Sequence, residues 1–173
     1  MMSNFGDFTD TDTLRLVRVL LAKPAQVWTY LTEPEKLSTW LAEAEIDLKL
    51  GGRVQLHMLA KDGPAAQRPM IHGTVTRCDP AQLLAFTWRD STCGIDAPET
   101  EVCFELSQQG EKTVLTLIHH RLPAEWLAPV GGGWHLLLED LQNRLLGRRP
   151  EPFMPRAQAI FPEYETRAKS IRG

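Results

Sequence analysis

The stretch WHLLLEDLQNRL, residues 134–145, decides how this chain folds. Its apolar residues recur at i, i+3, i+4, i+7 and i+11, namely Trp134, Leu137, Leu138, Leu141 and Leu145. In an α-helix this spacing gathers them into one stripe, so we expect a helix of about four turns with a single buried face. Gly147 predicts where the helix ends, because glycine readily adopts the left-handed conformation that closes many helices.

Alternating apolar and polar residues precede this helix and predict a series of strands. In the clearest of them, Val102, Phe104 and Leu106 are separated by Cys103 and Glu105. The predicted strands cover residues 14–20, 44–50, 54–58, 70–78, 83–89, 102–106 and 114–120. Most connections between them are short, apart from a loop at 61–69. Consecutive strands therefore pair in antiparallel fashion.

Two short helices are predicted between the first strand and the second. Pro24 suits the first position of a helix, and Val27, Trp28 and Leu31 follow at helical spacing. Pro34 breaks this helix and can begin another, which carries apolar residues at 37, 40 and 41.

These elements predict an α+β domain over residues 12–147. A seven-stranded antiparallel sheet has one apolar face to cover, and the 134–145 helix carries the large apolar stripe that can cover it. We therefore expect a helix-grip arrangement, with the curved sheet wrapped around the C-terminal helix. Residues 1–11 are expected to form a flexible leader, and residues 148–173 a separate tail with a short helix at 162–170.

The composition excludes several classes of protein. The chain has 173 residues, 43% hydrophobic and 24% charged, which suits one globular domain. Its formal net charge of −3 argues against a nucleic-acid-binding face. The polar, acidic N-terminus is unlike a signal peptide, and no apolar run is long enough to cross a membrane. Three cysteines without framework spacing favour a reducing, cytoplasmic location.

Several short motifs, taken in order, resemble those of a known family. The segment Pro24–Leu37 resembles its opening motif, and Trp40 stands where its second short helix carries a tryptophan. Gly51-Gly52-Arg53 resembles its first hairpin, Asp79-Pro80 begins a segment that resembles its central hairpin, and Trp134 opens the last helix. The chain thus resembles the activator-of-heat-shock-ATPase-like (AHSA-type) branch of the START/SRPBCC helix-grip superfamily.

The resemblance covers residues 13–147 and implies a cavity between the sheet and the long helix. In relatives this cavity holds lipids, polyketides or aromatic compounds, or is filled by side chains. The chaperone activators of the family also carry a separate N-terminal domain, for which this chain has no room. Residues 148–173 are additional to the family pattern.

Strand parity and the helical stripe select the residues expected to line such a cavity. They are Leu56, Met58, Phe104, His119, Trp134, Leu137, Leu138 and Leu141. Because this set carries no permanent charge, a ligand held there should be mainly apolar. His119 shares the parity of Leu115 and Leu117, so it either contacts a ligand, acts as a base or is a hydrogen-bonded core histidine. Gly131–Gly133 is interpreted as a flexible hinge at the cavity mouth.

The leading functional hypothesis is noncatalytic binding of a small apolar or amphipathic molecule. No nucleophile elbow, phosphate-binding loop or converging set of metal ligands is present, so we expect no metal and no cofactor. One alternative is an enzyme of the cyclase or dehydratase type that uses the cavity histidine. Another is a protein-interaction module in stress response or chaperone regulation. The oligomeric state is left open.

Overall fold

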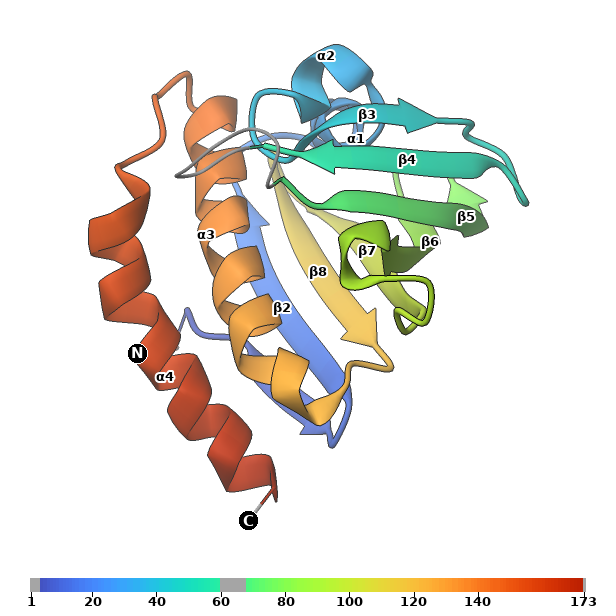
Figure 1. Cartoon of the computed structure of the whole chain (residues 1–173). Coiled ribbons are helices and arrows are strands. Elements are labelled where there is room, and N and C mark those ends of the chain that lie inside the picture. The colour runs from blue at the N-terminus through green and yellow to red at the C-terminus, as the bar shows by residue number, and fades with distance from the viewer. Residues whose placement is uncertain (1–3, 60–67, 173) are drawn as a thin grey trace.

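The computed structural model describes residues 4–59 and 68–172, so most of the loop expected at 61–69 lies outside the described residues. The strands are β1 (Asp7–Asp10), β2 (Thr13–Leu20), β3 (Ala42–Ile46), β4 (Arg53–Met58), β5 (Met70–Asp79), β6 (Leu83–Asp90), β7 (Thr100–Gln109) and β8 (Lys112–His120). The helices are α1 (Pro24–Thr32), α2 (Pro34–Leu37), α3 (Leu127–Leu145) and α4 (Phe153–Arg172), with short 3-10 turns η2 (Ser91–Cys93) and η3 (Ala124–Trp126). Figure 1 shows α3 lying against the sheet and α4 beside it.

The strands form a single antiparallel sheet in the order β1-β2-β8-β7-β6-β5-β4-β3. The α+β helix-grip prediction is therefore confirmed, with eight strands instead of seven. The extra strand is β1, which pairs with β2 from Asp7↔Arg15 to Asp10↔Thr13. The prediction of a flexible leader is thus wrong for residues 7–10, while residues 1–3 lie outside the described residues. This edge strand buries only Phe8, so it lacks the alternation that would have revealed it.

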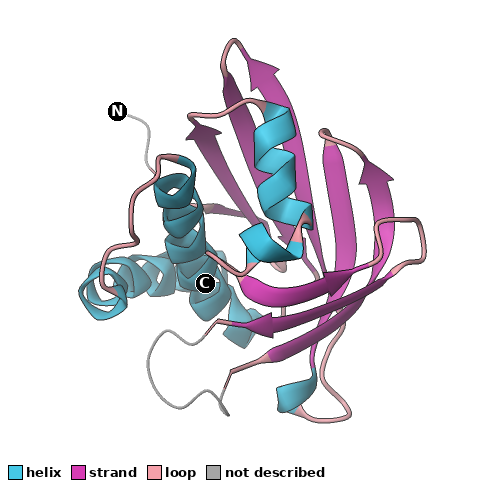
Figure 2. Cartoon of the chain, turned by 90° about the horizontal axis from the view of Figure 1, so that it is seen from above, coloured by secondary structure: helices cyan, strands magenta, loops and turns pink. Residues whose placement is uncertain are grey.

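The sheet curves strongly, as Figure 2 shows. One cause is the close approach of β5 and β6, which are paired and which also carry an irregularity between Val75 and Arg77. A Cβ atom added to Gly73 would lie 1.8 Å from the carbonyl oxygen of Thr87. Only glycine permits this approach, because any other residue would push the two strands apart.

Helix α3 begins at Leu127, earlier than predicted, and contains the three glycines Gly131–Gly133. They do not form a hinge. A Cβ on Gly131 would lie 2.6 Å from Cδ1 of Tyr164, and a Cβ on Gly132 would lie 2.7 Å from the ring of Phe161. Gly131 and Gly132 therefore allow α4 to pack closely on α3, which outweighs their poor helix propensity.

The C-terminal segment is also part of the domain and not a separate tail. Helix α4 runs from Phe153 to Arg172, well beyond the short helix expected at 162–170. Tyr164 and Ala168 are buried against the core, and Arg156 forms a 3.0 Å ion pair with the buried carboxylate of Asp140 on α3. Exposed Pro162 is tolerated within the helix.

The two short helices form as predicted and lie between β2 and β3. Val27, Leu31 and Leu37 are buried in the core. Trp40 is fully buried, and its indole Nε1 donates a hydrogen bond of 2.9 Å to the backbone oxygen of Tyr30. The core therefore continues from the concave face of the sheet under α1 and α2.

Candidate ligand-binding site

The residues predicted to line a cavity meet where α3 faces the concave side of the sheet. They come from β4, β7, β8 and α3, which lie far apart in the sequence. Within this set the buried residues are Leu56, Phe104, His119, Trp134, Leu138 and Leu141. Met58 and Leu137 are half-buried and pack against the same core. The wall they form is uncharged, as the sequence pattern indicated.

An aromatic cluster occupies the centre of this wall. The Trp134 ring centroid lies 5.4 Å from that of Trp88 and 5.8 Å from that of Phe104. Trp88 also stacks on Phe86 at 6.3 Å and meets the His119 ring edge-on at 5.6 Å. Such tilted and offset arrangements are favourable for aromatic pairs.

Trp88 was not among the predicted site residues, although it shares strand parity with Leu84 and Phe86. That parity indicated only a core residue. In the structure Trp88 is half-buried, whereas Trp134, Phe86 and Phe104 are buried. Val130 and Leu137 are half-buried too, and they flank Trp134 on the same helix face at i−4 and i+3. We call Trp88, Val130 and Leu137 the Trp88 patch, because each packs against the same core as Trp134 and keeps part of its surface in solvent.

His119 lies in a chain of hydrogen bonds behind the cluster. The indole Nε1 of Trp134 donates to His119 Nδ1 at 3.0 Å, so the proton of this neutral ring is on Nε2. Nε2 lies 2.7 Å from Thr100 Oγ1, to which it can donate, and the Thr100 hydroxyl donates to the backbone oxygen of Trp88 at 3.0 Å. Both ring nitrogens are therefore occupied.

The surroundings of His119 keep it neutral. Burial, together with the neighbouring charges of His120 and Arg121, lowers its pKa to about 3. A ring with no free nitrogen and such a low pKa is poorly suited to accept a proton from a substrate. Its evident role is to hold the Trp134 indole in place, which corresponds to the core-histidine interpretation.

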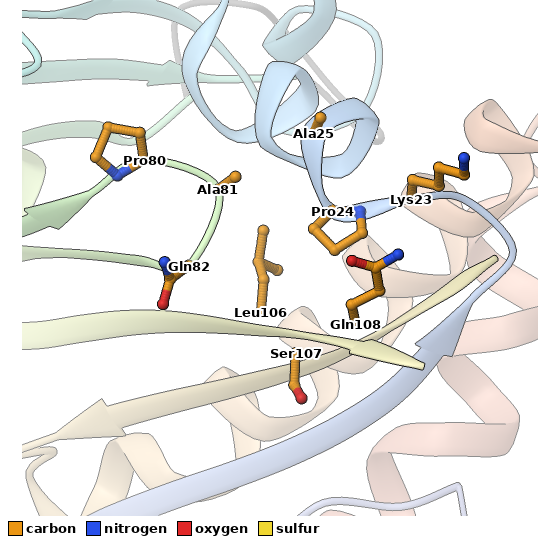
Figure 3. Close-up of a pocket in the computed structure, with 9 residues that line it drawn as sticks. All are labelled: Lys23, Pro24, Ala25, Pro80, Ala81, Gln82, Leu106, Ser107 and Gln108. Carbon is orange, nitrogen blue, oxygen red and sulfur yellow. The ribbon is translucent and has the colours of Figure 1, made fainter. Parts of the chain in front are cut away.

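The described surface also carries hollows away from this wall. One of about 540 Å³ lies between the start of α1 and the β5–β6 turn, above the end of β7. Figure 3 shows Leu106 between the turn and the helix, with Pro24 and Gln108 on one side and Pro80 on the other. A second hollow, of about 740 Å³, lies between α3 and the edge of β2. Neither opens at the aromatic cluster.

In residues 4–59 and 68–172, no three His, Cys, Asp or Glu side chains come close enough together to hold a metal ion. Within the same ranges, no helix combines the length and apolar character needed to span a bilayer.

Comparison with solved structures finds other proteins with the same architecture. A solution structure of the Bordetella parapertussis protein encoded by BPP1335 is 32% identical, with a TM-score of 0.75 over 95% of this chain and 91% of that one. The crystal structure of CalU16 from Micromonospora echinospora is 25% identical, with a TM-score of 0.72 over 90% and 88% of the two chains. None of the curated proteins matches.

The family match covers the part of the chain that builds the aromatic wall. The model of the activator of Hsp90 ATPase homolog 1-like proteins matches residues 21–145, from the end of β2 to the end of α3. This range includes the short helices, the strands from β3 to β8 and the long helix of the helix-grip fold. The chain therefore belongs to the activator of Hsp90 ATPase homolog 1-like family.

Proposed function

We propose that this protein binds a small, mainly apolar molecule where the concave sheet meets α3, and that it does so without chemical turnover. The observation that carries the proposal is the Trp88 patch. There a tryptophan packed on a buried aromatic cluster stays partly open to solvent. A ligand that covers this patch would extend the aromatic wall.

The energetics favour an apolar ligand. Removing apolar surface from water contributes roughly 25 cal/mol per Å², so every ~40 Å² of the patch that a ligand covers contributes about 1 kcal/mol. Flat rings gain further from offset or edge-on contact with Trp88. A charged group would lose its hydration here, since the surrounding wall offers no opposite charge.

The hydrogen-bond chain through His119 favours binding over catalysis. A cyclase or dehydratase that used this histidine would need a free ring nitrogen near the substrate. Here one nitrogen accepts from Trp134 and the other faces Thr100. To act as a base, His119 would have to lose one of these bonds within a buried site.

The test is a titration of the full chain with Nile red, a neutral dye whose emission rises in apolar surroundings. Wild type should bind it, and Trp88→Ala should weaken binding at least severalfold. Leu50→Ala is the matched control, because Leu50 is 76% exposed in the β3–β4 turn. Circular dichroism would establish that each variant is folded.

The outcomes separate the hypotheses. If folded wild type fails to bind the dye, or if Trp88→Ala binds it as well as wild type does, the proposal fails. The protein-interaction hypothesis would then take first place. Reduced binding by Trp88→Ala, with Leu50→Ala unchanged, supports a ligand at the Trp88 patch.

A further inference from the structure

A groove on the other side of α3 has a different chemistry from the aromatic wall. Strand β1 pairs with β2 only as far as Arg15. Beyond that residue, β2 pairs with β8 on one side, and its other side has no partner strand among the described residues. Helix α3 runs along this edge (Figure 1). Between them lies the hollow of about 740 Å³, a size typical of small-molecule sites.

The groove presents apolar surface to solvent. Val17 and Val19 on β2 line it and are 38% and 45% exposed, large fractions for valines in a sheet. Half-buried Phe5 adds apolar surface from the N-terminal segment, and fully buried Leu138 of α3 lies at the base of the groove. A ligand bound here would therefore cover apolar side chains as well as contact the charged side chains that line the groove.

The carboxylates that line the groove are already paired. Asp7 forms a 3.3 Å ion pair with Arg167, and Glu139 forms one of 3.1 Å with Arg156. Glu139 also lies 3.3 Å from His135 Nε2. These acidic groups are therefore largely neutralised by residues of α3 and α4.

The arginines that line the groove have no such partners. Within residues 4–59 and 68–172, none of the ion pairs involves Arg15, Arg18 or Arg148, all of which line the hollow. Three arginines and two carboxylates line the groove, so its lining carries a net positive charge, although Glu139 acts electrostatically on Arg18 and the whole chain carries a formal net charge of −3. A local field of this kind attracts anions.

Arg18 is the unusual member of the three. It lies on β2 between Leu16 and Leu20, both fully buried, and shares their parity. Its Nη1 donates to the backbone oxygen of Val17 at 2.9 Å. Its Nη2 is inaccessible to water and has no hydrogen-bond partner among the described residues. A buried donor left unsatisfied in this way is costly, and an anion would relieve the cost.

The backbone groups along the edge of β2 are less available to a ligand than the guanidinium of Arg18. The backbone oxygen of Val17 is bound by Arg18, and the side chain of Gln142 contacts the Val19 oxygen and the Leu21 amide, each at 3.4 Å. An added peptide strand would have to displace these contacts. A small molecule that needs only the guanidinium and the apolar walls would not.

We propose that the groove between α3 and the edge of β2 binds an amphipathic carboxylate, with Arg18 as the anchor for the carboxylate and Val17 and Val19 beneath the apolar part. A small turn of the Arg18 guanidinium brings Nη2 to the ligand. One singly charged head group balances the Arg18 guanidinium, whose Nη2 is buried, whereas the second charge of a phosphate would face only Arg15 and Arg148, which are exposed and screened by water. This site is separate from the Trp88 patch and does not depend on it.

The test compares decanoate with decyltrimethylammonium and decyl phosphate, all below their micellar concentrations, by calorimetry on the full chain. Decanoate should bind best, and Arg18→Met should weaken its binding roughly tenfold or more, the usual loss for a charge-assisted hydrogen bond. Arg18→Lys should retain part of the affinity. Arg53→Met is the matched control, because Arg53 is an exposed arginine on β4.

A positional readout identifies the site independently of affinity. In amide NMR spectra, decanoate should shift signals from Val17, Val19 and Gln142, and these shifts should persist in the Trp88→Ala variant. Arg18→Met should fold normally, because it removes a buried, unsatisfied charge.

Four results would overturn the proposal. The first is that wild type does not bind decanoate, and the second is that folded Arg18→Met binds decanoate as well as wild type does. The third is that wild type binds decyltrimethylammonium or decyl phosphate as tightly as decanoate, or more tightly. The fourth is that wild type binds extended acidic peptides but not decanoate. Loss of Nile red binding alone would refute the function proposed for the Trp88 patch and leave this inference intact.

Discussion

Replacing each of the three consecutive glycines of α3 by alanine separates helix propensity from helix packing. Each replacement favours the helix by about 1 kcal/mol, because alanine loses less backbone entropy than glycine. The positions differ in what an added Cβ would meet. At Gly133 nothing lies within 4 Å, whereas at Gly131 the Cβ would lie 2.6 Å from Cδ1 of Tyr164 and 3.0 Å from its Cε1.

The packing cost follows from the environment of Tyr164. Ordinary carbon–carbon contacts are about 3.5–4.0 Å, so the Gly131→Ala methyl would overlap the ring by about 1 Å. The ring has little freedom to move, because it is fully buried and its hydroxyl accepts from the Gly6 amide at 2.7 Å. Overpacking of this kind costs about 1–3 kcal/mol. At Gly132 the clash is with half-buried Phe161, which can shift more easily.

Urea unfolding followed by circular dichroism measures these differences. Gly133→Ala should be about 1 kcal/mol more stable than wild type, because it gains helix propensity alone. Gly131→Ala should be about 1–3 kcal/mol less stable than Gly133→Ala, and Gly132→Ala should fall between them. Equal stabilities for Gly131→Ala and Gly133→Ala would refute the close packing of α4 on α3 at Tyr164.

Four other predictions follow from the core and its charges. Because burial holds the pKa of His119 at about 3, below its unfolded value, the unfolded state binds the extra proton as the pH falls. Stability should therefore be full above pH ~6.5 and about 3 kcal/mol lower by pH 4, with a shallower pH dependence in folded His119→Asn. Arg156→Met should cost about 3 kcal/mol by removing the ion pair to buried Asp140, and Arg156→Met combined with Asp140→Asn should recover part of it. Leu141→Ala should cost about 2–5 kcal/mol in urea unfolding, whereas exposed Leu50→Ala should change stability by less than about 0.5 kcal/mol. Treatment with EDTA should leave the melting temperature unchanged, and a fall of many degrees would show that a metal is required.

The spacing of apolar residues predicted the core of the sheet and α3 well, because an element that buries one face must repeat apolar residues on that face. Val102, Phe104 and Leu106 alternate with residues of the opposite face, and all three are buried in β7. The apolar stripe of α3 was equally clear, since Trp134, Leu138 and Leu141 lie against the sheet. Strand β1 was missed because only Phe8 of its four residues is buried.

The site could be predicted only in part, because its decisive features are tertiary. Parity placed His119 on the concave face, yet nothing local indicates that Trp134 and Thr100 occupy its two nitrogens. The three glycines suggested a hinge, since a glycine run usually favours flexibility. The reason for the first two is the close approach of Tyr164 and Phe161 of α4, about thirty residues later in the chain. Arg18 gave no signal either, because one arginine in an apolar strand is equally compatible with a surface position.

The Arg18 groove is built partly from segments outside the family match, whereas the aromatic wall lies within it. The family match covers residues 21–145 and so leaves out β1, β2 and α4, while it includes α3. Tyr164 of α4 connects these parts, because its hydroxyl accepts from the Gly6 amide and lies 2.9 Å from His135 Nδ1 on α3. The N-terminal segment that Tyr164 holds, including Phe5, lines the groove together with Arg18. A fully exposed cation would attract a carboxylate only weakly, by about 0–1 kcal/mol. If the groove binds a carboxylate as proposed, its selectivity depends on β2 and the N-terminal segment, which lie outside the matched residues 21–145, whereas the aromatic wall lies within them.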